Sequence, residues 1–561
     1  MTSIKRIAII GGGPTGIACA RFLLAERAFS QIDVFEQRRN VGGIWNLSRN
    51  ESSKHLPVPQ TDPNHGTGTE LEFESPLYDY LETNIPKTLM AYSDLPFAEA
   101  LPLFPGHKDV LRYLEQYAEP VRHLIKFRTQ IINVQPMPKS EHSMDRLEQQ
   151  WRVTIKELIS GSIQQETYDA IVVAVGHYTV PHIPSIKGIE EFNTKFPDVI
   201  LHSKAYRRPE DFMNQKVLVI GNSASGLDIS AQIATSAQKP VYLASRSASQ
   251  LAPNDGGPAW RRDITEVEEF DSRSGSVRTK DGQVIEGLSK IVFATGYYFS
   301  YPFLMPASGP STFSTRDVSP SGTLSSVESE STSEGQNSSS DCKSTLQNLT
   351  TSGLRTHDVY KHFLHMIHPT LALPVLNLKI IPFPLAENQA AVIARLWSGR
   401  LELPTLEQMK TWEREEEQRL VQAHRLRPAP ETASSDSISS EASEASYEDS
   451  LKYEGGFHTL MYPEDAAQIN TLYGWAASAK SREGFENGGA GKLGGHWDAQ
   501  KVWLRGQFPN IKATFASHGE KRHTIKSLEE LGPEWEYAFA KWQQKTSKQD
   551  QCDLFRKAAV R

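Results

Sequence analysis

Two glycine-rich segments contain the residues whose types and spacing point most directly to chemistry. The first, GGGPTG, places Gly11, Gly13 and Gly16 in the pattern GxGxxG directly after a short apolar run. In this pattern the glycines allow a tight turn, a close approach of the backbone to a pyrophosphate, and close packing of the helix that follows. Glu36 stands twenty residues after Gly16, where an acid can accept hydrogen bonds from a ribose hydroxyl. The segment predicts a dinucleotide site for an unphosphorylated ribose.

The second segment, GNSASG, retains Gly221 and Gly226 and has Ser223 in place of the middle glycine. The Cβ of a serine should hold a pyrophosphate slightly farther from the backbone, although the hydroxyl can donate to it. Arg246 stands twenty residues after Gly226, at the position that matches Glu36 by counting, and follows Ser245. An arginine pairs with a ribose 2'-phosphate, which an acid would repel. The second segment therefore predicts a site that prefers NADP over NAD.

The two segments together indicate electron transfer between two different dinucleotides. FAD has an unphosphorylated adenosine ribose and NADPH a phosphorylated one, so a hydride can pass from NADPH to a flavin. Cys19, Cys342 and Cys552 lie far apart and form no CxxC pair, which leaves a disulfide reductase mechanism without a dithiol. Dioxygen, a quinone or a partner protein remain as electron acceptors.

Each glycine-rich segment lies between an expected strand and an expected helix. A strand at 6–10, a helix at 16–26 and a strand at 32–36 form one βαβ unit, and the same order recurs between 216 and 245. Apolar runs that end in glycine, at 170–176 and 290–296, close the two units. The pattern predicts an α/β fold with two Rossmann-like dinucleotide-binding domains, a larger FAD domain and a smaller NADPH domain inserted into it.

The order of these elements divides the chain into two folded domains and two inserts. We expect the first part of the FAD-binding domain in residues 1–177, the NADPH-binding domain in 178–296, and the return part of the FAD domain with C-terminal helices in 297–306 and 356–561. Residues 307–355 and 428–451 are rich in serine and contain too little apolar surface to offset the entropy of ordering. They are predicted to be disordered inserts.

The composition argues against several classes of partner. A formal net charge of -7 and a pI of about 6.2 give no overall positive field for nucleic acid or anionic membranes. No run of 18 or more apolar residues occurs, so no membrane span is expected. Three isolated cysteines fit a reducing compartment, and we expect the cytoplasm. A homodimer is compatible with the sequence.

Further motifs resemble those of the flavin-containing monooxygenases, and most closely those of the soluble fungal branch. The likeness spans nearly the whole chain outside the two serine-rich stretches. The segment GGIWN after Glu36, which contains Gly43, Ile44 and Trp45, is similar to the family's FAD segment. The segment TNIPK, which begins at Thr83, matches the family's TNxPK.

The segment FPDVILHSKAY, residues 196–206, resembles the family's identifying motif FxGxxxHxxx(Y/F). His202 and Tyr206 are in register, but Asp198 occupies the glycine position, which puts the geometry of this loop in question. Tyr206 also argues against the Baeyer-Villiger relatives, whose motif has tryptophan there. We interpret His202 as a structural histidine of the domain connection rather than a general base. The segment 381–404 is similar to the family's C-terminal return to the FAD domain.

The resemblance implies that NADPH reduces FAD and that the reduced flavin binds dioxygen as a 4a-hydroperoxyflavin. A soft sulfur or nitrogen nucleophile of a small molecule, a thiol, thioether or amine, then takes one oxygen atom, and no protein nucleophile is required. The asparagine of TNxPK lies by the flavin and nicotinamide in the family, so Asn84 is expected to orient the intermediate. An NADPH-dependent flavin reductase or oxidase that serves a partner protein, and a non-catalytic flavin-bound scaffold, stay open as alternatives.

Asn84 is the residue expected to take part in catalysis. The residues expected to contact FAD or NADP are Gly11, Gly13, Pro14, Thr15, Gly16, Glu36, Gly43, Ile44, Trp45, Thr83, Asn84, Gly221, Ser223, Ser225, Gly226, Asp228, Ser245 and Arg246. His362, His365 and His368 are spaced three apart without a neighbouring carboxylate cluster, so no metal site is expected.

Overall fold

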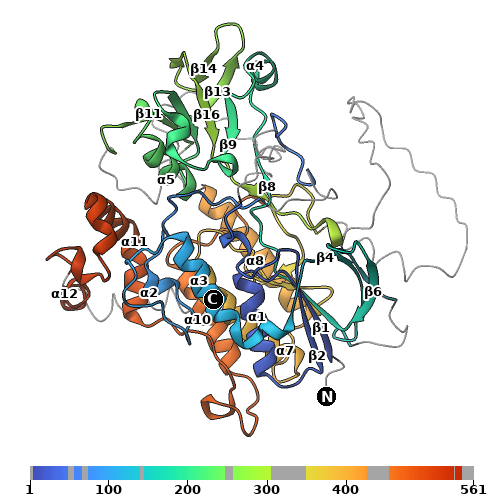
Figure 1. Ribbon diagram of the computed structural model, residues 1–561. Helices are drawn as coiled ribbons and strands as arrows, with labels where there is room; N and C mark the ends of the chain where they lie inside the picture. Colours follow the sequence, from blue (N-terminus) through green and yellow to red (C-terminus); the bar gives the residue numbers. More distant parts are fainter. Residues whose placement is uncertain are drawn as a thin grey trace, which may run out of the picture.

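The chain forms two bodies, a larger lower one and a smaller upper one that is made by the middle of the sequence (Figure 1). The computed structural model describes residues 4–48, 56–65, 74–138, 145–246, 257–304, 346, 349–425, 454–535 and 537–545. Each body has a sheet that is parallel, apart from the β18–β19–β20 edge of the larger one, and is flanked by helices; this confirms the predicted α/β class with two dinucleotide-type folds.

The lower body is built on a seven-stranded sheet. Its strands are β1 (Arg6–Ile10), β2 (Gln31–Glu36), β3 (Ile125–Phe127), β7 (Ala170–Val173), β18 (Val359–Tyr360), β19 (Leu364–His365) and β20 (Leu371–Ala372). They lie in the order β18-β19-β20-β7-β1-β2-β3. β1 pairs in parallel with both β2 and β7, so it is a central strand, and its apolar run RIAII is buried on both faces of the sheet. The strands β18, β19 and β20 follow the upper body in the sequence and return to this sheet.

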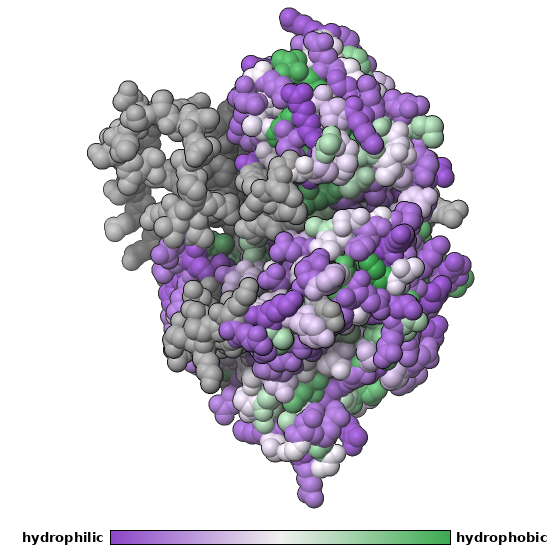
Figure 2. Space-filling model, turned by 90° about the vertical axis from the view of Figure 1, so that its left-hand side faces the viewer, coloured by the Kyte–Doolittle hydropathy of each residue, from purple (hydrophilic) through white to green (hydrophobic). Residues whose placement is uncertain are grey.

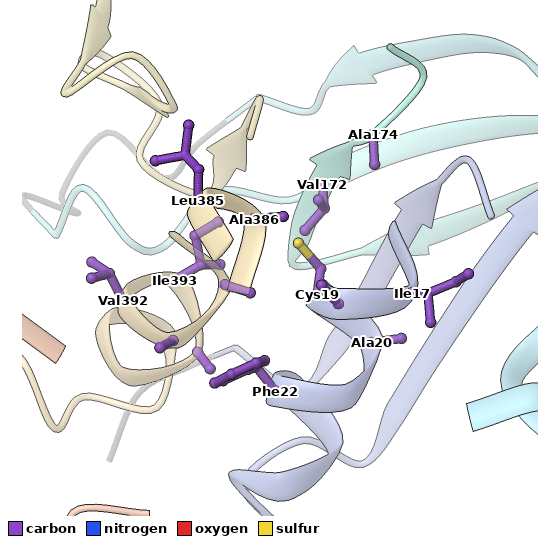
Figure 3. Packing of buried hydrophobic residues seen from close by; sticks show 14 of the residues in the cluster. Ile17, Cys19, Ala20, Phe22, Val172, Ala174, Leu385, Ala386, Val392 and Ile393 are labelled. Carbon is purple, nitrogen blue, oxygen red and sulfur yellow. The ribbon is translucent and has the colours of Figure 1, made fainter. Parts of the chain in front are cut away.

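The main core of the lower body lies between two helices, α1 (Pro14–Ala25) and α7 (Pro382–Trp397). Figure 3 shows Cys19 and Phe22 of α1 beside Ala386 and Ile393 of α7. Burial raises the pKa of the Cys19 thiol to about 12, so this cysteine is a core residue without thiolate reactivity. The other helices of this body are α2 (Lys87–Met90), α3 (His107–Ala118), α8 (Leu406–Arg425), α10 (Glu464–Ala477), α11 (Ala499–Ser517) and α12 (Ala538–Lys545).

A small antiparallel sheet covers a second core on the other side of the lower body. It consists of β4 (Thr129–Pro136), β5 (Trp151–Glu157) and β6 (Ile163–Tyr168). Leu346 and Leu349 are buried in this core, and Arg355 forms ion pairs with Glu413 at 2.7 Å and Glu417 at 2.8 Å on α8. Residues 349–355 therefore belong to the packed body, and the first serine-rich insert ends earlier than predicted. The sequence missed this because two leucines and one arginine suffice to anchor a short polar segment. The rest of the first insert, apart from Leu346, and the second insert lie outside the described residues.

The upper body contains a five-stranded sheet in the order β12-β11-β10-β16-β9. Its elements are β9 (Ile200–His202), β10 (Lys216–Ile220), α5 (Ala224–Ile233), β11 (Gln238–Ala244), β12 (Arg261–Ile264) and β16 (Lys290–Phe293), with α4 (Ile189–Lys195) at one end. The strands β13 (Val267–Asp271), β14 (Ser276–Thr279) and β15 (Val284–Ile285) form an antiparallel sheet beside it.

The chain passes between the bodies through two adjacent segments. β8 (Val180–Pro181) leads into the upper body and pairs with β17 (Tyr297–Tyr298), which leads back. The space-filling view in Figure 2 shows a largely hydrophilic surface, with apolar residues exposed where the two bodies meet. Within the described part of the chain, no helix is long and apolar enough to cross a membrane.

Candidate active site between the two nucleotide folds

The first glycine turn connects β1 to α1 in a geometry that requires glycine. Gly11 has a φ of +106°, and its N–H donates to the carbonyl oxygen of Phe35 at 2.8 Å. A Cβ on Gly16 would lie 1.9 Å from the carbonyl oxygen of Gly11, so no other residue fits there. The helix starts at Pro14 without a side-chain cap at Gly13 and without an acid in its first turn. Its N-terminus can therefore receive the pyrophosphate of a dinucleotide.

Glu36 lies at the end of β2 beside this turn. Its carboxylate accepts hydrogen bonds from the backbone N–H groups of Gly12 and Arg38, both at 2.7 Å, and the residue is 4% exposed. Burial raises the pKa of Glu36, and the two hydrogen bonds act in the opposite direction. The structure thus fixes an acid where a ribose hydroxyl of a dinucleotide on this turn would need an acceptor.

The GGIW segment packs directly on the first turn. The N–H of Gly42 donates to the carbonyl oxygen of Gly12 at 3.0 Å, and a Cβ on Gly43 would lie 3.0 Å from the Cα of Gly13. Ile44 is fixed through its carbonyl oxygen, which accepts from the hydroxyl of Ser75. Gly43, Ile44 and Trp45 form a short 3-10 helix here, so the structure brings the expected FAD residues from both segments together.

The second glycine turn repeats the first in the upper body. Gly221 has a φ of +111°, its N–H donates to the carbonyl oxygen of Ala244 at 2.9 Å, and a Cβ on Gly226 would lie 1.8 Å from the Gly221 oxygen. Ser223 takes the N-cap position with φ -81° and ψ -171°, close to the -75° and -177° of Gly13. This backbone is extended and open to any residue, which explains why a serine can replace the middle glycine. Ser223 and Ser225 are both exposed at the start of α5.

The two turns differ by one residue in their register with the following strand. Phe35 pairs with Ile10, and Ala244 pairs with Ile220, so the residue that follows Ala244 matches Glu36 in space. The count from the last glycine is 35 - 16 = 19 residues in the first unit and 244 - 226 = 18 in the second. Ser245 therefore stands at the Glu36 position and Arg246 one residue beyond it, which corrects the match made by counting. The connection between helix and strand is one residue shorter in the second unit.

Arg246 is at the strand end, as expected, but it has an acidic partner. Its Nε lies 2.6 Å from Oε1 of Glu266, and 71% of its side chain is exposed. Ser245 is held by its N–H, which donates to the carbonyl oxygen of Ile264 at 3.2 Å. Glu266 was not anticipated, because it comes from a segment whose proximity depends on the pairing of β11 with β12.

Asp228 faces the junction between the two bodies. Its carboxylate accepts hydrogen bonds from the Tyr78 hydroxyl of the lower body and from the Gln232 amide at 3.1 Å. Burial raises the pKa of Asp228. The carboxylate thus binds side chains at the junction, and direct contact with a coenzyme stays a prediction.

The segment from Glu82 to Lys87 also lies near this junction. Thr83 is 4% exposed and donates its hydroxyl to the carbonyl oxygen of Ile85 at 2.9 Å, so its side chain stabilises its own loop. Asn84 is half-buried, and its side-chain amide makes no hydrogen bond to another described residue. The amide is therefore free to contact a ligand. Lys512 of α11 donates to the Thr83 carbonyl oxygen at 2.8 Å, a contact that no motif in the sequence indicates.

Residues 196–206 lie beside the connection between the two bodies. Asp198 has a φ of +66°, so it adopts the left-handed conformation that a glycine would take there. Aspartate tolerates this region better than most residues, and the loop geometry survives the replacement. His202 is fully buried, with Nε2 3.0 Å from the Gly296 carbonyl oxygen and Nδ1 accepting from the Lys204 N–H at 3.1 Å. Burial lowers its pKa to about 3, so His202 is a neutral structural residue, as interpreted from the sequence.

Comparison with known proteins agrees with this geometry. The family model described as flavin-binding monooxygenase-like matches residues 4–255. The thiol-specific monooxygenase of Saccharomyces cerevisiae is 30% identical over 408 residues, which cover 72% of this chain and 79% of that protein. The flavin-containing monooxygenase FMO GS-OX3 of Arabidopsis thaliana is 32% identical over 420 residues, with 72% and 76% covered.

Two solved structures share the fold. The S-allyl-L-cysteine S-oxygenase from Allium sativum aligns with a TM-score of 0.63 and 23% identity over 96% of this chain and 99% of that chain. Tmm from Pelagibacter sp. strain HTCC7211 aligns with a TM-score of 0.59 and 18% identity over 91% of each chain.

Paired dinucleotide folds, one with Glu36 at its strand end and the other with Ser245 and then Arg246, are typical of an oxidoreductase that uses a flavin and a pyridine nucleotide. The chain belongs to the flavin-containing monooxygenase family. It is an FAD-dependent monooxygenase with NADP as its second cofactor, and the two glycine turns fit these groups.

Proposed function

We propose that this chain uses NADPH and dioxygen to place one oxygen atom on the sulfur of a small thiol or thioether. The observation that carries the coenzyme part is the pair of glycine turns with matching backbone angles, one followed by Glu36 and the other by Ser245 and Arg246. The sulfur preference rests on two similar proteins, a thiol-specific monooxygenase and an S-allyl-L-cysteine S-oxygenase. A small amine is the second class of substrate.

The residues of the lower body hold FAD, which supplies the activation of dioxygen when it is bound. The N-terminus of α1 faces the pyrophosphate, and the buried carboxylate of Glu36 accepts a ribose hydroxyl. Gly43 packs directly on Gly13 of the turn, and Trp45 packs against the neighbouring core.

The residues of the upper body hold NADPH. The N-terminus of α5 receives its pyrophosphate, with Ser223 and Ser225 exposed beside it, and Arg246 pairs with the 2'-phosphate. Asn84 orients reacting groups with an amide that has no competing partner in the described part of the chain. No protein base is needed: the buried, neutral His202 has both ring nitrogens occupied by backbone groups.

The test is to follow NADPH, dioxygen and hydrogen peroxide together in the purified flavoprotein. Glutathione, S-methylcysteine and N,N-dimethylaniline represent a thiol, a thioether and an amine. We expect a sulfur compound to stimulate dioxygen uptake and to gain one oxygen atom by mass spectrometry. Dioxygen that all appears as peroxide, whatever compound is added, would instead indicate an oxidase, and failure of NADPH to bleach the flavin would indicate a scaffold. Family membership favours neither of these alternatives.

The setting of the reaction is also a proposal. A small-molecule substrate and dioxygen fit the family, and buried Cys19 together with the absence of a CxxC pair fits a reducing cytoplasm. A homodimer stays a prediction, and light scattering on the purified protein would test it.

A further inference from the structure

The carboxylate of Glu266 bridges two cations at the end of β11. Arg246 Nε lies 2.6 Å from one oxygen and Lys280 Nζ lies 2.6 Å from the other. The backbone fixes Lys280 against Glu266, because the N–H of Lys280 donates to the Glu266 carbonyl oxygen at 2.9 Å. These two residues flank the paired strands β13 and β14, whose register joins Val267 to Thr279. The three charges therefore occupy one place in the fold.

Arginine and lysine that clasp a carboxylate form an arrangement that also suits a phosphate. Arg246 and Lys280 are 71% and 63% exposed at their side chains, so both can turn towards a ligand, whereas Glu266 is only 26% exposed. Partial burial acts to raise the pKa of Glu266, but hydrogen bonds from Lys280 and Arg246 outweigh it, and the net shift is downward. The carboxylate is thus ionised at neutral pH.

Two other arginines near this strand end already have acidic partners. Arg261 lies 2.9 Å from Asp263, and Arg278 pairs with Glu269 on the far side of β13. Asp281, the acid directly after Lys280, accepts a hydrogen bond from the hydroxyl of Thr265 at 2.7 Å. Among the described residues, Lys280 is thus the lysine that shares an anion with Arg246.

We propose that Lys280 is a second cation for the coenzyme 2'-phosphate and that Glu266 competes with this phosphate for both cations. The inference rests on the proposed NADPH site. When the phosphate arrives, Arg246 and Lys280 turn to it, and Glu266 remains nearby as a like charge that weakens binding. Glu266 thereby sets how strongly the site discriminates NADPH from NADH.

The test compares two ligands that differ only in the 2'-phosphate, adenosine 2',5'-bisphosphate and 5'-AMP, by calorimetry on the FAD-loaded enzyme. The affinity ratio of the two ligands isolates the 2'-phosphate. Glu266→Gln removes the charge and retains the shape, so the ratio should rise about 1.5- to fivefold, the range for exposed ion pairs. Lys280→Met removes the second cation at similar length, so the ratio should fall by a similar factor.

Glu269→Gln is the matched control, because Glu269 lies three residues after Glu266, on β13, and pairs with Lys187 at 3.0 Å; this variant should leave the ratio unchanged. An unchanged or lower ratio in Glu266→Gln would contradict the proposal that Glu266 competes with the phosphate. An unchanged ratio in Lys280→Met would contradict the proposal that Lys280 binds the phosphate. Equal affinity of the wild-type enzyme for both ligands would contradict the NADPH site itself, a failure that is distinct from either variant result.

Discussion

The ammonium group of Lys512 lies 2.8 Å from the carbonyl oxygen of Thr83, the residue directly before Asn84. The same lysine lies 3.7 Å from Glu82, which Arg522 also contacts at 3.0 Å. Two cations from the C-terminal segment thus hold one short loop that is more than 400 residues away in sequence. Desolvation lowers the pKa of Lys512, while Asp228 of the upper body and Glu82 act to raise it. The lysine therefore lies where both bodies and the Asn84 loop meet.

Replacing Lys512 with methionine should loosen this loop while retaining the side chain's packing on Phe104. We expect the share of oxidised NADPH that appears as hydrogen peroxide to increase, because Asn84 loses its fixed backbone. The free energy of unfolding should fall by about 1–3 kcal/mol, the cost of a lost charged hydrogen bond. Parallel assays of peroxide and product check the first effect, and urea unfolding checks the second. Lys521→Met, at an exposed site of the same segment, is the control; equal peroxide in both variants would mean that Lys512 does not fix the Asn84 loop.

Asn84→Ala should separate flavin reduction from oxygen transfer. The residue's amide has no protein partner in the described structure, so its removal should cost little stability and leave the FAD content unchanged. NADPH oxidation should continue while peroxide replaces most of the oxygenated product. The measurement is the ratio of peroxide to product with Thr88→Ala, an exposed neighbour, as control. Product formation at the wild-type ratio would exclude the orienting role.

The sequence predicted the two nucleotide folds because their determinants are local. Gly11, Gly16, Gly221 and Gly226 stand where an added Cβ would collide with backbone, so their spacing alone reveals the turns. Counting along the chain was off by one residue at Arg246, since the register is set by strand pairing and not by chain length.

The features that the sequence missed depend on contacts between distant segments. Glu266 meets Arg246 only because β12 pairs with β11, and Lys512 meets Thr83 only because α11 packs beside α2. Residues 349–355 were predicted to be disordered from their composition, but the burial of Leu349 and the ion pairs of Arg355 order them. Composition is averaged over a window of residues, so it does not reveal single side chains, such as Leu349 and Arg355, that hold a segment in place.

Gly16 and Gly13, both in the first glycine turn, should respond very differently to substitution. Gly16→Ala forces a Cβ to within 1.9 Å of the Gly11 carbonyl oxygen, so α1 must shift. We expect the free energy of unfolding to fall by about 1–3 kcal/mol or more and the variant to lose FAD. Gly13→Ser should fold normally, because Gly13 has the same extended backbone that Ser223 adopts in the second turn, and the nearest atom lies at 3.6 Å. Thermal unfolding and the flavin content of the purified variants check both expectations. A Gly16→Ala enzyme that retains FAD would contradict the close packing of Gly16 against the Gly11 carbonyl.

Arg246→Ala should change coenzyme preference. The guanidinium is exposed and stands one residue after the strand-end serine, so its loss should raise the KM for NADPH about tenfold or more and leave that for NADH nearly unchanged. Steady-state rates with both coenzymes give the comparison. Arg208→Ala, which removes an exposed cation paired with Asp211 at 3.0 Å, is the control. A parallel rise in both constants would mean that the 2'-phosphate is held elsewhere.

Stability should decrease in mild acid because several histidines are buried in the neutral form. Desolvation lowers the pKa of His202, His362 and His365 to about 3 in the folded chain, from an ordinary value of 6.5. Below pH 6.5 the unfolded chain takes up protons that the folded chain does not, so each histidine lowers the free energy of unfolding by up to about 1.4 kcal/mol per pH unit until pH falls to about 3. Urea unfolding between pH 7.5 and pH 5 measures this slope. His202→Gln should reduce the slope by one histidine's share, whereas His123→Gln, at an exposed site, should not change it. An equal slope in wild type and His202→Gln would mean that His202 is protonated in the fold.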